Sequence, residues 1–396
     1  MGEGWGGGLC VSLKVLTQDL ALSILNMRTL GIDPGTVSFD LCCLEDTSEL
    51  VLDAKLDASI ASPDLSKDPA LLIDAVRRCM PFDLAVGPSG YGVPLLRGDQ
   101  IGEAELAQMM LVRADEGKQS VGIGGLKALI RALIDTGAPL VFLPGVIHLP
   151  TVPAHRKANR IDMGTADKVC SVAQAIVEQA QRLQIEYADT SFIMLELGGA
   201  FSAAIAVEHG QIIDGAGGSS GPLGYRASGA LDGEAAYLLG AHISKDTIFS
   251  GGALDIAGRA AKQIDFEQWA QHTDPNLQTG WLAWFESFLK TVHALTAILP
   301  QPREILLSGR LSSSPMIEAA FAERLNRIAP VRRLMGLSRS DGEYLQSKSA
   351  AQGAALIANG LAGGRYKPLV DRLNLRGASG TVLDHLYLRD AAQIRI

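Results

Sequence analysis

The segment Gly31-Ile32-Asp33-Pro34-Gly35-Thr36 forms a glycine turn between two predicted strands, and it is the strongest indication of the architecture. The residues at 28–33 and 37–45 have the composition of buried strands, and a third strand is predicted over 50–56. The first strand thus ends in an acidic residue, and the turn passes directly into the next strand.

The same pattern returns later in the chain, around Glu196-Leu197-Gly198-Gly199-Ala200-Phe201-Ser202. Predicted strands at 191–197 and 200–208 flank these glycines, and a third strand follows at 211–214. Alignment of the two turns places Asp33 opposite Glu196, so each copy has an acid two residues before its turn. A repeated unit of this kind predicts two similar lobes.

Elsewhere, helical and strand patterns alternate, which is typical of an α/β architecture. A long helix is predicted over 165–184, because Asp167 stands in its first turn and apolar residues recur on one face. The other predicted helices lie near 69–79, 103–115, 125–136, 232–241, 252–273, 278–298, 315–328 and 347–362, and the other strands at 83–87, 139–143 and 304–307.

The composition excludes several classes of protein. The chain has 396 residues, a formal net charge of −8 and 47% hydrophobic residues, as expected of a globular protein with a sizeable core. The negative charge argues against a nucleic-acid binder, and no apolar run is long enough to predict a membrane span. Five cysteines without Cys-x-x-Cys spacing are expected to be reduced thiols in a cytoplasmic protein. Residues 1–26, which begin Gly-rich, are expected to be an N-terminal extension.

The first glycine turn has the chemistry of a phosphate site. Glycine lets a ligand approach the backbone closely, and successive N–H groups attract an anion. Asp33 could hold Mg²⁺ through water, and the hydroxyl group of Thr36 could reach a phosphate. The alternative is an ordinary hairpin turn. The second turn favours the phosphate interpretation, because two facing turns could clamp one polyphosphate.

Three further segments are candidates for chemistry. Arg226 lies in a Gly- and Ser-rich loop at 215–233, and its forked, permanently charged guanidinium suits a phosphoryl group or a carboxylate. The alternative is a solvated surface arginine. The strand that ends at Ser308-Gly309-Arg310 and the small-residue helix around Gly353 are weaker signals, for which buried packing is the alternative.

Other catalytic motifs are missing from the sequence. It contains no P-loop and no clean Gly-x-Gly-x-x-Gly after a strand, and it has Tyr91 where a nucleophile elbow needs glycine. His148 and His155 could act as ligands or acid–base groups, or they could be local structural residues.

These segments, in this order, resemble the acetate and sugar kinase/actin-like ATPase superfamily over residues 28–364. The turn at 31–36 is similar to its first phosphate motif, 195–202 to its second and 305–310 to its adenosine motif. Residues 160–167 are similar to the start of its first connecting helix, and 349–364 to its second connecting helix. The run from Leu197 through Arg226 to Asp232 is most similar to the acetate and butyrate kinase branch. The whole chain looks most like a family labelled predicted butyrate kinase.

The resemblance implies an α/β fold of two duplicated ribonuclease-H-like lobes, at 27–164 and 165–364, with a nucleotide cleft between them. The helix near 347–362 would return towards the first lobe, and 365–396 would form a C-terminal tail. The resemblance also implies phosphoryl transfer that uses ATP and Mg²⁺, with lobe closure excluding water.

The resemblance further implies a role for each matching residue. Asp33, Arg226 and Glu196 would be catalytic, and Asp33 would also hold the metal. The nucleotide would be bound by Gly35, Thr36, Gly198, Gly199, Ser202, Ser308, Gly309 and Gly353. The acceptor-side candidates are Ser89, Tyr91, His148 and Asp167.

Three functions remain open. The first is an ATP-dependent phosphotransferase, similar to butyrate and acetate kinases, acting on a small carboxylate or a related small metabolite. The second is an ATP-hydrolysing conformational switch or maturation protein of the same fold. The third is a degenerate, non-catalytic protein that binds nucleotide without turnover. The second gains support because Met163 replaces a histidine of the acetate kinases and no arginine stands at 88–90. The expected partner is a small-molecule substrate, with no nucleic acid and no membrane, and a homodimer stays open.

Overall fold

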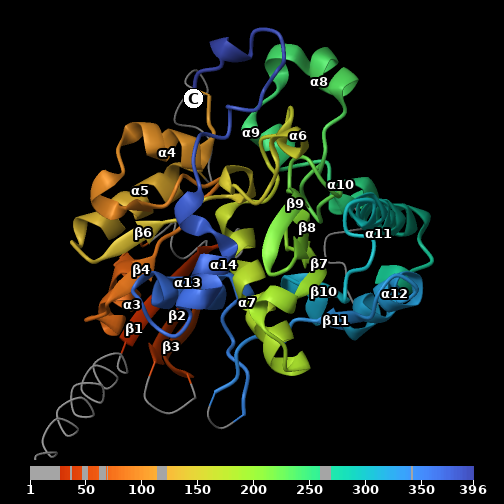
Figure 1. Ribbon diagram of the computed structural model, residues 1–396. Helices are drawn as coiled ribbons and strands as arrows, with labels where there is room; N and C mark the ends of the chain where they lie inside the picture. The colour runs from red at the N-terminus through yellow and green to blue at the C-terminus, as the bar shows by residue number, and fades with distance from the viewer. Residues whose placement is uncertain are drawn as a thin grey trace, which may run out of the picture.

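The computed structural model describes residues 27–35, 38–46, 52–61, 68, 70–113, 123–258, 269–339 and 342–396. Thr36 and the expected extension at 1–26 lie outside these residues. The described chain forms two β-sheets with a pair of helices between them (Figure 1).

The first sheet has the strand order β3-β2-β1-β4-β6-β5. Its first three strands form an antiparallel meander, and β4 runs parallel to β1. The strands are β1 (Met27–Pro34), β2 (Ser38–Asp46), β3 (Leu52–Ala61), β4 (Leu84–Val86), β5 (Leu96–Arg97) and β6 (Leu140–Phe142). The outer face packs against α3 (Ala70–Cys79), α4 (Glu103–Met110) and α5 (Ile123–Asp135).

The second sheet repeats this topology with the order β11-β10-β7-β8-β9. Again three strands form an antiparallel meander, and a later strand, β10, pairs in parallel with the first. The strands are β7 (Ser191–Leu197), β8 (Ser202–Glu208), β9 (Gln211–Ala216), β10 (Glu304–Ser308) and β11 (Val331–Arg333). The outer face packs against α11 (Pro275–Thr296) and α12 (Pro315–Leu325). The repeat predicted from the sequence is thus a repeat of strand topology.

Two helices from distant parts of the chain form the central layer (Figure 1). Helix α7 (Ala166–Leu183) contacts the second sheet, and α13 (Ser349–Leu361) packs on β1, β2 and β4 of the first. The helices approach each other closely at Gly353, where a Cβ atom would lie only 1.8 Å from the carbonyl oxygen of Cys170. Gly353 therefore serves helix packing, the alternative that the sequence had left open.

The strands divide their side chains between two cores, as their period of two requires. In β7, Ile193 and Leu195 face the outer helices, whereas Phe192 and Met194 face the central layer. In β1, Leu30 and Ile32 likewise face outward. The central helices are consequently covered by apolar side chains from both sheets.

Shorter elements complete the described chain: α6 (Ala154–Lys157), α8 (Gly233–Leu239), α9 (Lys245–Ile248), α10 (Ala253–Ala257) and α14 (Lys367–Leu373). The prediction of a helix over 252–273 was wrong in the extent of that helix. Helix α10 ends at Ala257 because Gly258 has a positive φ of 68° and cannot continue it, and 259–268 lie outside the described residues. Beyond α13, buried apolar residues of α14 and the following turns pack on the central core.

Two findings bear on the composition. Cys42, Cys43, Cys79 and Cys170 are buried, and none of these four forms a disulfide bond. Among the described helices, none combines the length and the hydrophobicity that crossing a membrane requires.

Candidate functional site

A cavity of about 1430 Å³ is lined by residues of both lobes. The ends of β1 and β7 reach it from the two sheets, and the N-terminal ends of α7 and α13 reach it from the central layer. The lining includes many residues proposed from the sequence: Asp33, Gly35, Ser89, Tyr91, Asp167, Glu196, Gly198, Gly199, Ser308 and Gly309.

The two glycine turns open onto this cavity at equivalent places. Asp33 is the penultimate residue of β1, and Glu196 is the penultimate residue of β7. A Cβ atom at Gly198 would come within 2.3 Å of the carbonyl oxygen of Phe201, so the second turn needs glycine. The alignment of the two acids therefore corresponds to a real equivalence of position.

A lysine neutralises the acids of the first turn. Lys348, the residue before α13, places its Nζ 2.8 Å from Asp40 Oδ2 and 3.5 Å from Asp33 Oδ2. It also donates a hydrogen bond to the carbonyl oxygen of Ser38 (2.8 Å). Burial raises the pKa of the Asp33 carboxyl to about 7, although the Lys348 charge opposes this shift. Lys348 thus ties the start of α13 to the first hairpin.

A second lysine links the acids near the other turn. Lys168 of α7 forms an ion pair with Asp167, and its Nζ lies 3.8 Å from Glu196 Oε1. Burial favours a higher pKa for Asp167, but Lys168 and a hydrogen bond from Thr165 outweigh it, so the pKa is lowered. The other oxygen of Glu196, Oε2, is buried without a hydrogen-bond partner within the described part of the chain. Glu196 itself lines the cavity.

Asp162 holds the loop after β9 at the edge of the cavity. Its carboxylate accepts hydrogen bonds from the backbone N–H of Ser219 (2.9 Å), the Ser219 hydroxyl (3.1 Å) and the N–H of Gly164 (3.1 Å). A Cβ atom at Gly217 would lie 1.8 Å from Asp162 Oδ1, which explains the glycine there. Asp162 therefore positions part of the Gly- and Ser-rich loop that the sequence singled out.

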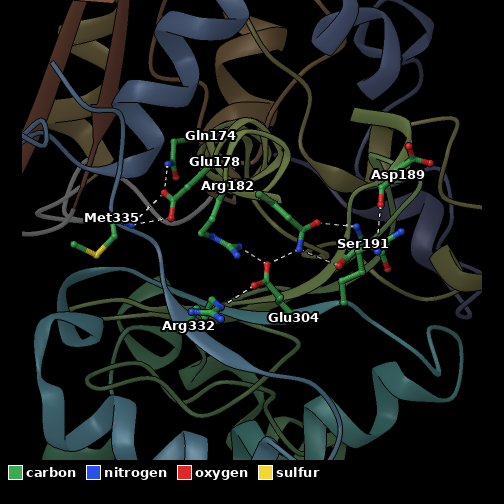
Figure 2. Close-up of polar contacts among 10 residues, drawn as sticks. Gln174, Glu178, Arg182, Asp189, Ser191, Glu304, Arg332 and Met335 are labelled. Atoms are coloured by element: carbon green, nitrogen blue, oxygen red, sulfur yellow. Dashed lines mark hydrogen bonds and ion pairs between the residues drawn. The ribbon is translucent and has the colours of Figure 1, made fainter. Parts of the chain in front are cut away.

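The loop after β11 is attached to α7 by one carboxylate (Figure 2). Glu178 accepts hydrogen bonds from the backbone N–H groups of Met335 (3.1 Å) and Gly336 (3.0 Å). Since both of these loop residues line the cavity, Glu178 fixes one of its walls.

A second carboxylate in the same view fixes the strands behind this loop (Figure 2). The buried Glu304 of β10 pairs with Arg182 of α7, and its Oε1 lies 2.9 Å from Arg332 Nε of β11. A buried carboxylate needs such partners, because its desolvation is otherwise costly. The contacts of Glu178 and those of Glu304 together anchor β10 and β11 to the central layer.

Four residues proposed from the sequence do not line the cavity: Arg226, Ser202, Gly353 and His148. The Arg226 side chain is exposed, although its backbone N–H donates to the carbonyl oxygen of Ala200 (3.0 Å) beside the second turn. Ser202 is fully buried on β8.

His148 lies beneath the C-terminal segment, away from the cavity. It is 2% exposed, and its carbonyl oxygen accepts a hydrogen bond from the N–H of Ser379 (3.1 Å). Burial lowers the pKa of the imidazole to about 4. Ser89 does line the cavity, but its hydroxyl donates to the carbonyl oxygen of Gly87 (3.0 Å) and accepts from the N–H of Leu143 (2.9 Å). The burial of His148 and the hydrogen bonds of Ser89 are therefore typical of structural residues.

The lysines of the cavity were not predicted from the sequence. Lys168, Lys245 and Lys348 all line it, and each stands at or just inside the N-terminal end of a helix. A positive charge is unfavourable there unless acids or a ligand compensate for it. That placement was the signal that could have identified them.

The sequence profile of the family described as "Protein of unknown function (DUF1464)" matches residues 31–388. No curated protein matches the sequence.

Solved structures of acetate and propionate kinases are similar to this chain. The chain is similar to the acetate kinase of Porphyromonas gingivalis, at 13% identity and a TM-score of 0.50, over 83% of this chain and 98% of that one. It is similar to the acetate kinase of Entamoeba histolytica, at 13% identity and a TM-score of 0.51, over 76% of this chain and 86% of that one. It is also similar to a propionate kinase of Francisella tularensis subsp. tularensis SCHU S4, at 13% identity and a TM-score of 0.55, over 83% of this chain and 98% of that one. At such low identity the structural likeness shows the fold alone. It confirms the predicted two-lobed α/β architecture of the actin-like ATPase type.

Proposed function

Because this chain belongs to the DUF1464 family and has the fold of acetate and propionate kinases, we propose that it is an ATP-dependent phosphotransferase acting on a small carboxylate or a related small metabolite. One observation carries the proposal. Two glycine turns, each preceded by an acid, open from opposite lobes onto one cavity.

The cavity is large enough for two ligands. Its volume of about 1430 Å³ exceeds the roughly 300–1,000 Å³ of a usual small-molecule pocket. The ATP phosphates would lie between Gly35 and the turn at 198–199. The adenosine would lie against Ser308, Gly309 and the loop that Glu178 fixes. The remaining volume would accommodate the acceptor.

The carboxylates of the cavity suit Mg²⁺. Glu196 lines the cavity, its buried Oε2 has no hydrogen-bond partner among the described residues, and carboxylate oxygen is the ligand that Mg²⁺ prefers. Glu196 and Asp33 would hold the ion together with the phosphates. When bound, Mg²⁺ would neutralise charge on the β- and γ-phosphates.

The chain's own residues would then position the reaction. An acceptor oxygen attacks the γ-phosphorus in line, the bond to the β-phosphate oxygen breaks, and ADP leaves. Backbone N–H groups of the turn at 198–199 would hold the transferred phosphoryl group. Arg226, whose backbone is fixed beside Ala200, would swing its guanidinium onto the charge that develops in the transition state.

The position of Arg226 also favours a second candidate function. Its side chain does not line the cavity, and no arginine stands at 88–90. A protein that hydrolyses ATP to drive lobe motion needs no acceptor-side arginine. The alternative is therefore an ATP-driven conformational switch.

Calorimetry and a turnover assay test the proposal. Binding of Mg-ATP would be measured first, and then ADP release with acetate, propionate and butyrate. Acid-dependent ADP release supports the phosphotransferase, whereas acid-independent release supports the switch. The absence of binding at millimolar Mg-ATP would contradict both.

The role of Arg226 can be measured separately. Arg226→Ala should lower turnover about 10²–10³-fold with little change in the Kd of Mg-ATP, because the interaction forms in the transition state. Arg324→Ala, at an exposed position on α12, is the control. An equal loss of turnover and of ATP affinity would refute this role.

A further inference from the structure

The short helix α9 presents two side chains to the cavity. Lys245 is its first residue, and Phe249 follows its last, with the N–H of Phe249 donating to the carbonyl oxygen of Lys245 (3.1 Å). Residues four apart lie on the same face of a helical turn. Both line the cavity, so α9 places an ammonium group beside an aromatic ring there.

Lys245 meets a residue of the other lobe. It is 7% exposed, its Nζ donates a hydrogen bond to Tyr91 Oη (3.2 Å), and it lies 4.6 Å from the centre of the Tyr91 ring. A nearly buried ammonium next to a hydroxyl is a natural binding point for a carboxylate. Tyr91 was proposed from the sequence as an acceptor-side residue, but Lys245 was not.

Phe249 belongs to an aromatic pair beside the phosphate turn. Its ring packs edge-on against Phe201, with the ring centres 4.7 Å apart. Phe201 also lines the cavity and directly follows Ala200 at the end of the second turn. The pair thus forms an apolar wall next to the proposed position of the γ-phosphate.

Helix α9 is also joined to the loop that contains Arg226. The N–H of Ser228 donates to the carbonyl oxygen of Ile248 (3.4 Å), and the N–H of Gly252 donates to that of Arg226 (2.9 Å). The chain on both sides of Phe249 is therefore held against the Arg226 loop. A ligand seated on α9 would lie beside the residues that we assign to phosphoryl transfer.

We propose that α9 is the acceptor-recognition element, in which Lys245 and Tyr91 bind a carboxylate and Phe201 and Phe249 bind a short apolar tail. The inference rests on the proposed function, and it names residues that would determine the acceptor. A purely polar acceptor would leave the aromatic wall without a partner. A carboxylate with a few methylene groups satisfies both the ammonium group and the rings.

The first test is binding rather than turnover. Titration calorimetry would measure sodium butyrate and sodium acetate against the full chain saturated with Mg-ADP. Lys245→Met should weaken butyrate binding at least about 10-fold, because a hydrogen bond to a charged group is lost, whereas Lys245→Arg should retain most of it. Phe249→Ala should reduce the preference for butyrate over acetate. Lys290→Met and Leu282→Ala, at exposed positions on α11, are the matched controls.

A second measurement separates recognition from a structural role. If Lys245 only latched the lobes through Tyr91, Lys245→Met would weaken Mg-ATP and butyrate equally, and this result would overturn the inference. Butyrate affinity unchanged from that of Lys290→Met would overturn it as well, as would failure of the unmodified chain to bind any carboxylate. Thermal unfolding of each variant checks that it is folded.

The outcomes also distinguish this inference from the proposed function. Lys245-dependent butyrate binding without phosphorylation would support the recognition site and refute the phosphotransferase. Phosphorylation of butyrate that does not depend on Lys245 would do the reverse.

Discussion

At the scale of single residues, ion pairs explain why the cavity contains both buried acids and buried lysines. Asp33 and Asp40 are tolerated because Lys348 lies between them, and Asp167 is tolerated because Lys168 pairs with it. Removing one member of such a pair leaves an uncompensated buried charge, so these residues also contribute to stability. Glu196 differs, since one of its oxygens has no hydrogen-bond partner in the described chain.

His148 gives a pH dependence of stability whose sign is fixed. Burial lowers the pKa of His148 from 6.5 to about 4, so below pH 6.5 the unfolded chain takes up a proton that the folded chain refuses. The free energy of unfolding is therefore unaffected by this group above pH 6.5. It decreases as the pH falls towards 4, by up to about 3 kcal/mol at 1.36 kcal/mol per pKa unit.

Urea unfolding between pH 4.5 and 7.5 measures this effect. His148→Phe should flatten the dependence of the free energy of unfolding on pH in that range, and His242→Gln, at an exposed position, should not. Identical slopes for His148→Phe and the unmodified chain would refute the assignment.

Gly353 tests the contact between the two central helices. A methyl group there would lie 1.8 Å from the Cys170 carbonyl oxygen, a backbone atom that cannot move aside cheaply. Gly353→Ala should therefore destabilise the protein by about 1–3 kcal/mol, despite the better helix propensity of alanine. Gly233→Ala, at a helical position with nothing within 4 Å, should leave the midpoint of urea unfolding almost unchanged. Equal midpoints for the two variants would mean that the helices separate easily.

At the scale of elements, Glu178 couples α7 to the loop at 333–336. Glu178→Ala would remove the acceptor of two backbone N–H groups, so the loop that lines the cavity should lose its fixed position. We expect the Kd of Mg-ATP to rise about 10-fold, since hydrogen bonds to a charged group are among the stronger ones. Calorimetry on Glu178→Ala, Glu178→Gln and the exposed Glu323→Ala measures this, and unchanged affinity in the first variant would show that the loop does not contact nucleotide.

The sequence predicted the long elements better than the short ones. Helix α7 and the meanders around the two turns were found, because their apolar periodicity extends over many residues and their glycines mark the turns. Strands β5 and β11 have two and three residues, too few to show a period, and they lack the apolar runs that mark the equally short β4 and β6. Helix α9 was missed for the same reason, and with it Lys245.

The candidate site was predictable only where a turn or a motif marked it. Asp33 and Glu196 were found by the repeat. Lys348 pairs with acids more than 300 residues away in sequence, and its position at the start of a helix does not indicate which acids it contacts. The position of the Arg226 side chain depends on rotamers and loop geometry that a sequence does not contain.

At the scale of the whole molecule, ligand binding between the lobes should stabilise both. A ligand that binds only the folded chain adds about 2.7 kcal/mol at 100 times its Kd. Mg-ATP should therefore raise the Tm in differential scanning calorimetry, and adenosine at the same concentration should raise it much less, because it has no phosphates for the two turns to hold. Equal shifts with both ligands would argue against a polyphosphate clamp.

The contact between β1 and α13 has a consequence for synthesis on the ribosome. The Thr29 hydroxyl donates to the carbonyl oxygen of Ala355, 326 residues later, and a Cβ atom at Gly31 would lie 2.0 Å from that of Ala351. One face of the first sheet is thus covered by a helix that is synthesised more than 300 residues later. At the usual 5–20 residues per second, that interval is roughly 15–65 s. The first sheet is therefore covered on this face only after the strands of the second sheet have been made, and until then the nascent chain exposes an apolar surface.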